Sequence, residues 1–471
     1  MSKHHEGIQQ LCQNQDFRLL HVTRHKNKYR MRLVRPCIHK GHQQRVLEEG
    51  YYALSHLWGN AKDYPYWQVD GFISDKEGGG RKVDPVPMRP EKRDTLIALL
   101  KKHANSYWWI DVLCARVDTP LMIMGSIYRY CKSCVALIDM ADPFSMHQLE
   151  ALSGALSKAS GGYYYANRLL HRRPNMTSKQ VERLVFSNIL SLHGIESDFG
   201  KELNVVLQVI QSRWFTRVWT AQEFLLPKQI ILMPEQRASA PTRYSMDFAL
   251  LEKITERLDT IYRVIDRIPL LEKSTQHLVV TRRVGSMHVL CGRSHQREGV
   301  LDIYNNHHSR VLPRLRNVFE ALASSSRVCA VPVDYVYGVI GMLELDVPRL
   351  DHPQDVWKAF LDELRKLLAH LTEQDQGCMW AKVVKDETFD LANAKNLGHV
   401  YTGLVKFSRR RNRKSKRGHH SVSVNNRLNY YDSSHLGAVQ YMLMTVAPPA
   451  ITRYDNKNLP TSIEHLPHGE F

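Results

Sequence analysis

The spacing of hydrophobic residues predicts alternating strands and helices over the first half of the chain. Residues 16–21 and 29–34 alternate apolar and polar side chains at about every second position, which is typical of strands. Continuous apolar runs begin at Tyr51, Tyr107 and Val135, as expected for strands that are buried on both faces of a parallel sheet. The pattern therefore predicts an α/β fold.

Helices are predicted between and after these strands. Asp94 is a favourable N-cap for a helix whose residues Leu96, Leu99, Leu100 and His103 share one face, and this helix links the runs at Tyr51 and Tyr107 into a strand–helix–strand unit.

Residues 212–226 are predicted to form one helix that ends before Pro227, and residues 229–233 to form a strand. The buried face of that helix is expected to hold Phe215, Val218, Trp219, Gln222 and Leu226. Two amphipathic helices, at 246–266 and 352–371, predict a largely helical remainder.

Composition indicates a globular protein that is large enough for one large or two medium domains. The 471 residues are 43% hydrophobic and 24% charged, the start of the chain lacks the apolar region of a signal peptide, and no run is suited to crossing a bilayer. Eight scattered cysteines indicate reduced thiols, so the cytosol, or alternatively the nucleus, is the expected location. Cys131 and Cys134 are interpreted as small buried residues, and no metal site is predicted at Cys37, His39 and His42, which lack a second ligand cluster.

The net charge is +18, and one tract supplies eight of these charges: residues 406–420 hold eight Lys or Arg residues and no acid, which leaves +10 on the rest of the chain. Its central part, residues 409–417, has neither interleaved aromatic residues nor a hydrophobic period, so the tract is predicted to be a solvated loop. A nuclear import signal, or an electrostatic patch for nucleic acid or anionic lipid, remains open as its function.

Polar residues follow the predicted strands where a ligand would bind in a parallel sheet. Ser55 and Asp111 come at the ends of the strands at Tyr51 and Trp108, and residues 217–223 could add Arg217 and Glu223. We predict that these four residues approach one crevice, with Asp111 and Glu223 as the acidic candidates for catalysis.

Structural roles remain open for the same four residues. Ser55 could cap a turn, Asp111 could accept backbone N–H groups, and Glu223 could pair with Arg213 and Arg217 as scaffolding.

Three blocks of the chain together resemble the signature of the fungal heterokaryon incompatibility (HET) domain. They read Tyr-Ala-Leu-Ser-His-Leu-Trp-Gly at 52–59, Trp-Ile-Asp-Val-Leu-Cys at 109–114 and Arg-Val-Trp-Thr-Ala-Gln-Glu at 217–223. The motif residues are Tyr52, Ala53, Leu54, Ser55, Trp58, Gly59, Trp109, Ile110, Asp111, Cys114, Arg217, Trp219, Gln222 and Glu223. Weaker matches extend the resemblance over about half of the chain.

The resemblance implies a protein of fungal non-self recognition that triggers cell death, with protein partners in that signalling and self-association as a further expectation. The HET domain is in turn similar to the TIR fold, some members of which cleave NAD. An NAD hydrolase is therefore the alternative enzymatic function. No cofactor is implied, because NAD would be the substrate of that enzyme. A nucleic-acid-associated protein that uses residues 406–420 is the other alternative.

The chain departs from the family pattern after Cys114. The loop to Met124 is shorter than usual and lacks the family's Asn, Gln and Glu residues, and His56 replaces the usual Tyr. This difference argues against catalysis by this copy.

The predicted organisation is therefore a HET-like domain at 1–235, a helical region packed on it at 236–405, a basic loop at 406–420 and a tail at 421–471.

Overall fold

A computed structural model provides the coordinates of the chain. It describes residues 3–26, 28–57, 66–69, 73–75, 83–116, 118–139, 146–172, 198–235, 245–266, 327–374 and 391–402, together with isolated residues between 180 and 322. The chain divides into two compact units. The first comprises Met1–Thr119, Ser126–Phe215 and Pro227–His295, and the second comprises Pro120–Gly125, Thr216–Leu226 and Gln296–Phe471.

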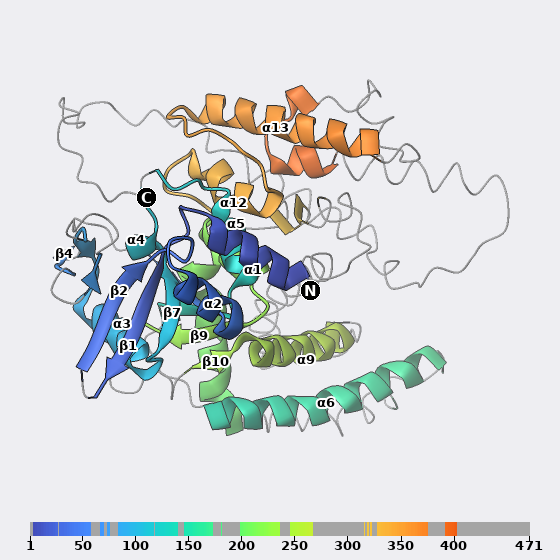
Figure 1. The fold of residues 1–471 in the computed structure, drawn as a ribbon. Helices are drawn as coiled ribbons and strands as arrows, with labels where there is room; N and C mark the ends of the chain where they lie inside the picture. The colour runs from blue at the N-terminus through green and yellow to red at the C-terminus, as the bar shows by residue number, and fades with distance from the viewer. Residues whose placement is uncertain are drawn as a thin grey trace, which may run out of the picture. The chain divides into compact units, whose positions relative to one another are not determined.

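An eight-stranded sheet forms the centre of the first unit, in the order β10-β9-β8-β3-β7-β1-β2-β5 (Figure 1). Its strands are β1 (Leu19–His25), β2 (Lys28–Val34), β3 (Tyr52–His56), β5 (Ile73–Ser74), β7 (Ser106–Ile110), β8 (Ser133–Ile138), β9 (Ile230–Pro234) and β10 (Met246–Asp247). The four neighbours β9, β8, β3 and β7 are parallel, while β1 and β2 form an antiparallel hairpin beside β7. The predicted α/β class is confirmed.

The parallel strands are apolar because helices cover them. Every residue of β8 is buried, and so are Tyr107 to Ile110 of β7. The helices of this unit are α1 (Lys3–Gln13), α2 (Lys40–Glu49), α3 (Pro90–Lys102), α4 (Asp111–Cys114), α5 (Ile123–Tyr130), whose first residues belong to the second unit, α6 (Met146–Arg172) and α9 (Phe248–Asp266). Helices α6 and α9 lie side by side (Figure 1). A separate two-stranded sheet pairs β4 (Tyr66–Trp67) with β6 (Val86–Pro87).

Helix α3 begins earlier than predicted. Asp94 lies inside the helix and does not cap it, because Pro90 occupies the first turn, where its fixed backbone angle and missing N–H are tolerated. Leu96, Leu99 and Leu100 of the predicted face are buried, whereas His103 lies just beyond the helix as its C-cap and is half-buried.

The prediction of one continuous helix over residues 212–226 is wrong. A 3₁₀ turn η1 (Arg213–Phe215) ends in the first unit, and the short helix α8 (Thr220–Leu225) belongs to the second. Between them the backbone pairs with a distant segment: the Val218 N–H donates to the Val328 carbonyl at 3.0 Å, and the Val328 N–H donates to the Thr216 carbonyl at 2.6 Å.

Helices dominate the described part of the second unit. They are α8, α12 (Asp334–Leu343), α13 (Pro353–Gln374) and the 3₁₀ turn η4 (Leu391–Asn393). The amphipathic pattern of α13 buries Val356, Phe360 and Leu364, while Leu367 on the same stripe is half-buried. The helical C-terminal region is thus confirmed.

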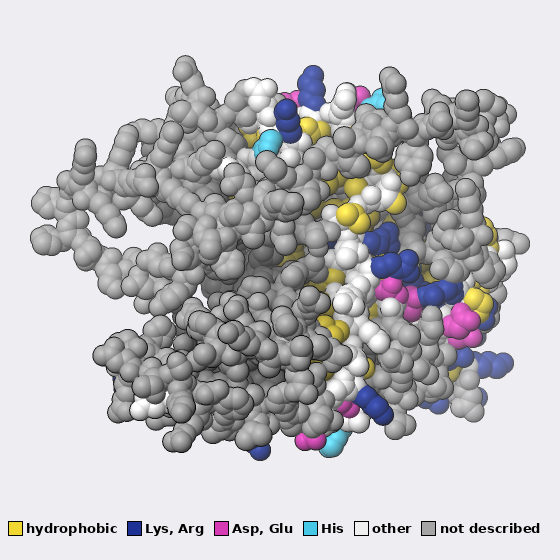
Figure 2. All heavy atoms as spheres, turned by 180° about the vertical axis from the view of Figure 1, so that it is seen from behind, with side chains coloured by type: hydrophobic (Ala, Val, Ile, Leu, Met, Phe, Trp, Pro, Cys, Tyr) yellow, Lys and Arg dark blue, Asp and Glu magenta, His cyan; other side chains and the backbone are white. Residues whose placement is uncertain are grey.

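Several predictions lie outside the described residues: Trp58, Gly59, the basic tract at 406–420 and the tail at 421–471. Among the described residues the charge is mixed. On the face drawn in Figure 2, Lys and Arg side chains lie beside Asp and Glu side chains, with hydrophobic side chains between them. No helix in the described ranges has the length and apolar character needed to cross a membrane.

A cluster of rings joins β1, β7 and α2. The buried His21 ring stacks on Tyr107 with centroids 4.4 Å apart. The centroid of the His42 ring lies 5.1 Å from that of His21. His42 Nδ1 lies 2.8 Å from the Tyr107 hydroxyl. Burial, followed by the nearby His42, Arg45 and Arg32, lowers the pKa of His21 to about 4, and burial also lowers the pKa of His42.

This cluster predicts a loss of stability in mild acid. Between pH 6.5 and about pH 4 the unfolded chain binds a proton at His21 that the folded chain does not, so the free energy of unfolding falls as the pH falls through this range. We expect the free energy of unfolding to be lower by about 1 to 2 kcal/mol at pH 5 than at neutral pH. This range already allows for solvent screening, because the cluster lies near the surface. Thermal unfolding of His21→Phe should show a weaker pH dependence than the parent, whereas His25→Phe, exposed on the same strand, should match the parent. Identical curves for all three proteins would contradict the expectation.

Candidate functional site

Polar residues follow all four parallel strands where they end. Ser55 and His56 close β3, Asp111 follows β7, Asp139 follows β8 and Glu235 follows β9. The strands are in register at this end, since Leu54 pairs with Ile110 and His56 with Leu137. Ligands of parallel sheets bind outside the carboxyl ends of the strands, so this edge is the candidate site.

His56 and Asp111 form a pair between neighbouring strands. His56 Nε2 lies 3.1 Å from Asp111 Oδ1, and the histidine is buried at 4% exposure. Burial lowers the pKa of His56, the charge of Lys92 adds to this effect, and the Asp111 carboxylate opposes it. A neutral imidazole beside a carboxylate can accept a proton, which is the chemistry of a general base.

Asp111 also has a structural role. Its Oδ1 atom accepts a hydrogen bond from the backbone N–H of Val112 at 2.7 Å, within the first turn of α4. A carboxylate at this position is stabilised by the free N–H groups and the partial positive charge of the helix start. The side chain is 14% exposed, so solvent reaches it.

Ser55 supports a buried tryptophan. The indole Nε1–H of Trp214 donates to the Ser55 hydroxyl oxygen at 2.5 Å, and both residues are buried. The hydroxyl thereby satisfies an indole donor that would otherwise be costly to bury. Trp214 lies within the 212–226 block, but the predicted helix face omitted it.

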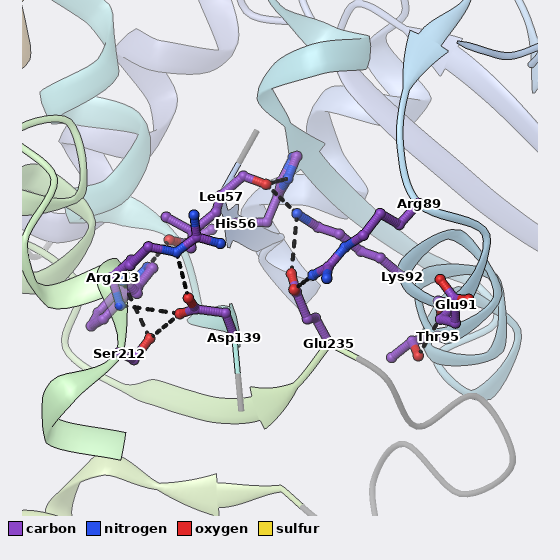
Figure 3. Close-up of polar contacts among 12 residues, drawn as sticks. His56, Leu57, Arg89, Glu91, Lys92, Thr95, Asp139, Ser212, Arg213 and Glu235 are labelled. Carbon is purple, nitrogen blue, oxygen red and sulfur yellow. Dashed lines mark hydrogen bonds and ion pairs between the residues drawn. The ribbon is translucent and has the colours of Figure 1, made fainter. Parts of the chain in front are cut away.

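Asp139 fixes the segment that carries Trp214. Its carboxylate accepts hydrogen bonds from the Ser212 hydroxyl at 2.6 Å and the Arg213 backbone N–H at 3.1 Å, and it pairs with Arg213 Nε at 2.7 Å (Figure 3). Arg213 therefore pairs with Asp139, which the predicted network around Glu223 did not include.

Glu235 is the most deeply buried carboxylate of this edge. Its side chain is 1% exposed, and its two oxygens form ion pairs with Arg89 and with Lys92, the latter at 3.4 Å. Lys92 also donates a hydrogen bond to the Leu57 carbonyl, as Figure 3 shows. Buried charges of opposite sign need such pairing, because removing one partner leaves a desolvated charge.

A continuous polar network results at the carboxyl edge. It runs from Asp111 through His56 and the Leu57 carbonyl to Lys92 and Glu235. The sequence interpretation found Asp111 at one end but missed Lys92 and Glu235 at the other. An acid two residues after the strand predicted at 229–233 was the available signal.

Arg217 and Glu223 belong to the second compact unit, whereas Ser55 and Asp111 belong to the first. The Arg217 carbonyl accepts hydrogen bonds from Arg327 Nη1 at 2.7 Å and from the Thr220 hydroxyl at 2.9 Å, while Glu223 is buried on α8. A crevice shared by all four residues remains a prediction.

Most other motif residues pack within their own units. Tyr52 stacks on Trp108 with centroids 4.8 Å apart, and Trp109 meets Tyr128 edge to face at 5.4 Å. In the second unit, Gln222 Nε2 donates to the Gly338 carbonyl at 3.0 Å. Ala53, Leu54, Ile110 and Cys114 are buried, and Trp219 is half-buried.

Burial disfavours the reactive thiolate form of two cysteines in the first unit. Burial raises the pKa of Cys114 to about 11 and that of Cys131 to about 12. Cys131 and Cys134 are buried at 1% and 0% exposure, as predicted for small core residues. Within the described ranges, no three His, Cys, Asp or Glu side chains are grouped so that they could hold a metal ion.

Residues 51–223 match the family model described as Heterokaryon incompatibility protein (HET). No curated protein and no solved structure matches the chain significantly.

Proposed function

We propose that the chain acts in non-self recognition and cell-death signalling between fusing fungal cells, through the region at 51–223 that matches the HET family model. The family match is the observation that carries this proposal. The geometry is consistent with it, because the first two signature blocks include neighbouring parallel strands whose carboxyl ends hold the polar network. Its partners are then other proteins of this signalling pathway, including a second copy of the chain. The chain binds them in the cytosol or the nucleus.

Expression in a fungal host tests the proposal. The intact chain should arrest growth, and Asp111→Asn should abolish the arrest without lowering the melting temperature by more than a few degrees, because the amide keeps the size of the side chain but not its charge. Glu223→Gln tests the second unit in the same way.

Asp94→Asn is the matched control, since its side chain is 50% exposed on α3 and outside the network. Growth arrest that persists in Asp111→Asn and Glu223→Gln alike would argue against a role for these carboxylates. A host that grows normally with the intact chain would argue against the function itself.

NAD cleavage is a second candidate, favoured by the partly exposed Asp111 carboxylate beside His56 at the carboxyl edge of the parallel strands. A carboxylate in a cleft stabilises the cationic sugar that forms when a nicotinamide bond breaks. Purified protein incubated with NAD should then release nicotinamide, and Asp111→Asn should not. If the intact protein releases no nicotinamide, the NAD-cleavage candidate is wrong and the signalling function does not involve this reaction.

A further inference from the structure

The β1–β2 hairpin continues beyond the rest of the sheet. Strand β1 pairs with β7 only from Leu20 to Val22, and β2 pairs with β5 only at Met31 and Arg32. Residues 23–25 and 28–30 pair with each other alone in the part of the chain that the structure describes. The end of the hairpin is thus a two-stranded ribbon, drawn as the paired blue arrows β1 and β2 in Figure 1.

This ribbon is strongly basic. Between Phe17 and Leu47 the chain holds nine Lys or Arg residues and no Asp or Glu. Four of them, Arg24, Lys26, Lys28 and Arg30, are exposed at the end of the hairpin. Lys101, exposed in the last turn of α3, adds a fifth, with its Nζ atom 5.8 Å from the centroid of the Tyr29 ring. We call these five residues the basic ribbon.

No carboxylate neutralises the basic ribbon among the described residues. The ion pairs found in those ranges involve other cations, such as Arg45 with Glu49 on α2. Local contacts instead hold the ribbon in shape: the Arg24 N–H donates to Asn105 Oδ1 at 3.1 Å, and Arg24 Cζ lies 5.7 Å from the Tyr29 ring centroid. The register places Lys28 and Arg30 on one face of the ribbon and Arg24 on the other, so the cations line both faces. Together they produce a positive field that attracts a polyanion.

We propose that the basic ribbon binds the phosphate backbone of double-stranded DNA, independently of base sequence. A two-stranded ribbon has the width that the major groove of a duplex admits. Lys and Arg side chains on it reach phosphates on both sides of that groove. The basic tract at 406–420 is a separate element, and the ribbon's role does not depend on it.

Other polyanions fit the ribbon less well. Binding in a membrane interface needs apolar side chains that enter the acyl boundary, whereas the exposed residues at the end of this hairpin are Arg24, His25, Lys26, Lys28 and Arg30. Single strands are bound by stacking bases on open aromatic rings. The Tyr29 ring is only partly exposed and has the cations of Arg24 and Lys101 against it.

Salt-dependent binding of the full chain tests the proposal. The probes are a short DNA duplex of arbitrary sequence, the corresponding RNA duplex, and vesicles containing anionic phospholipid. The triple variant Arg24→Gln, Lys28→Gln and Arg30→Gln should bind the DNA duplex more weakly, and the slope of log K against log salt should fall by about 3, one for each phosphate that the variant no longer neutralises. The comparison is repeated in a chain whose residues 409–417 are neutralised, so that the tract cannot mask the effect.

The control removes equal charge elsewhere, with Lys358→Gln, Arg365→Gln and Lys366→Gln on the exposed face of α13. It should leave the slope unchanged. Equal losses in both triple variants, or no loss in the ribbon variant, would overturn the proposal, and so would binding to vesicles alone or to the RNA duplex alone. Charged edge strands also prevent aggregation, so a ribbon variant that aggregates yet binds duplex with the parental slope would show that the charges serve solubility.

Discussion

Trp214→Ala should lower the free energy of unfolding by about 3 to 5 kcal/mol, because it removes a large aromatic side chain from a closed core. Trp214 is 0% exposed, and its ring meets Phe215 edge to face at 4.8 Å. The substitution also deprives the Ser55 hydroxyl of its indole donor at 2.5 Å. Thermal and denaturant unfolding measure the loss.

Trp219→Ala is the matched comparison. Trp219 was the tryptophan that the sequence pattern placed in the core, but its side chain is half-buried, so its truncation should cost less than that of Trp214. Trp214→Phe should recover part of the loss by refilling the space. Equal destabilisation by both alanine variants would mean that exposure does not rank these two sites.

Gly125→Ala should destabilise the second unit by about 3 kcal/mol or more, since an added methyl group would overlap backbone atoms that cannot move aside. A Cβ atom on Gly125 would collide with the carbonyl group of Gly341. The contact is mutual: a Cβ on Gly341 would lie 2.6 Å from the Gly125 nitrogen and 3.1 Å from its Cα.

Gly154→Ala gives the control for the change of residue type. Gly154 is exposed within α6, and a Cβ added there would have no atom within 4 Å, so alanine should raise stability by up to about 1 kcal/mol through its higher helix propensity. Gly338→Ala should be intermediate, because its nearest neighbour is the Val218 side chain at 3.0 Å, which can shift. A Gly125→Ala protein as stable as the Gly154→Ala protein would contradict the close approach.

The local hydrophobic pattern was sufficient to predict the parallel strands. It was insufficient to predict the structure of residues 212–226. The runs at Tyr51, Tyr107 and Val135 are strands because burial on both faces demands continuous apolar sequence. Residues 212–226 carry an equally regular pattern but are interrupted, because Val218 pairs with Val328. A hydrogen bond to a segment so distant in the sequence leaves no trace in local periodicity.

The candidate site divides in the same way. Asp111 was predicted because it directly follows a recognisable strand. Lys92 was missed because a lysine near a helix start is normally solvated, and only the burial of Glu235 beside it reveals the pairing. Whether Arg217 and Glu223 join Asp111 depends on the arrangement of the two units, which local pattern does not encode.

The interleaving of the two units has a consequence for how the protein is made. Two pieces of the family-matched region, residues 120–125 and 216–223, belong to the unit that Gln296–Phe471 completes. Val218, Gln222 and Gly125 meet their partners only when Val328, Gly338 and Gly341 have left the ribosome. Domains normally fold in the order of synthesis, but here the third signature block must wait for the C-terminal half. A premature stop codon after the family-matched region would therefore yield a chain whose signature helix lacks its packing partners.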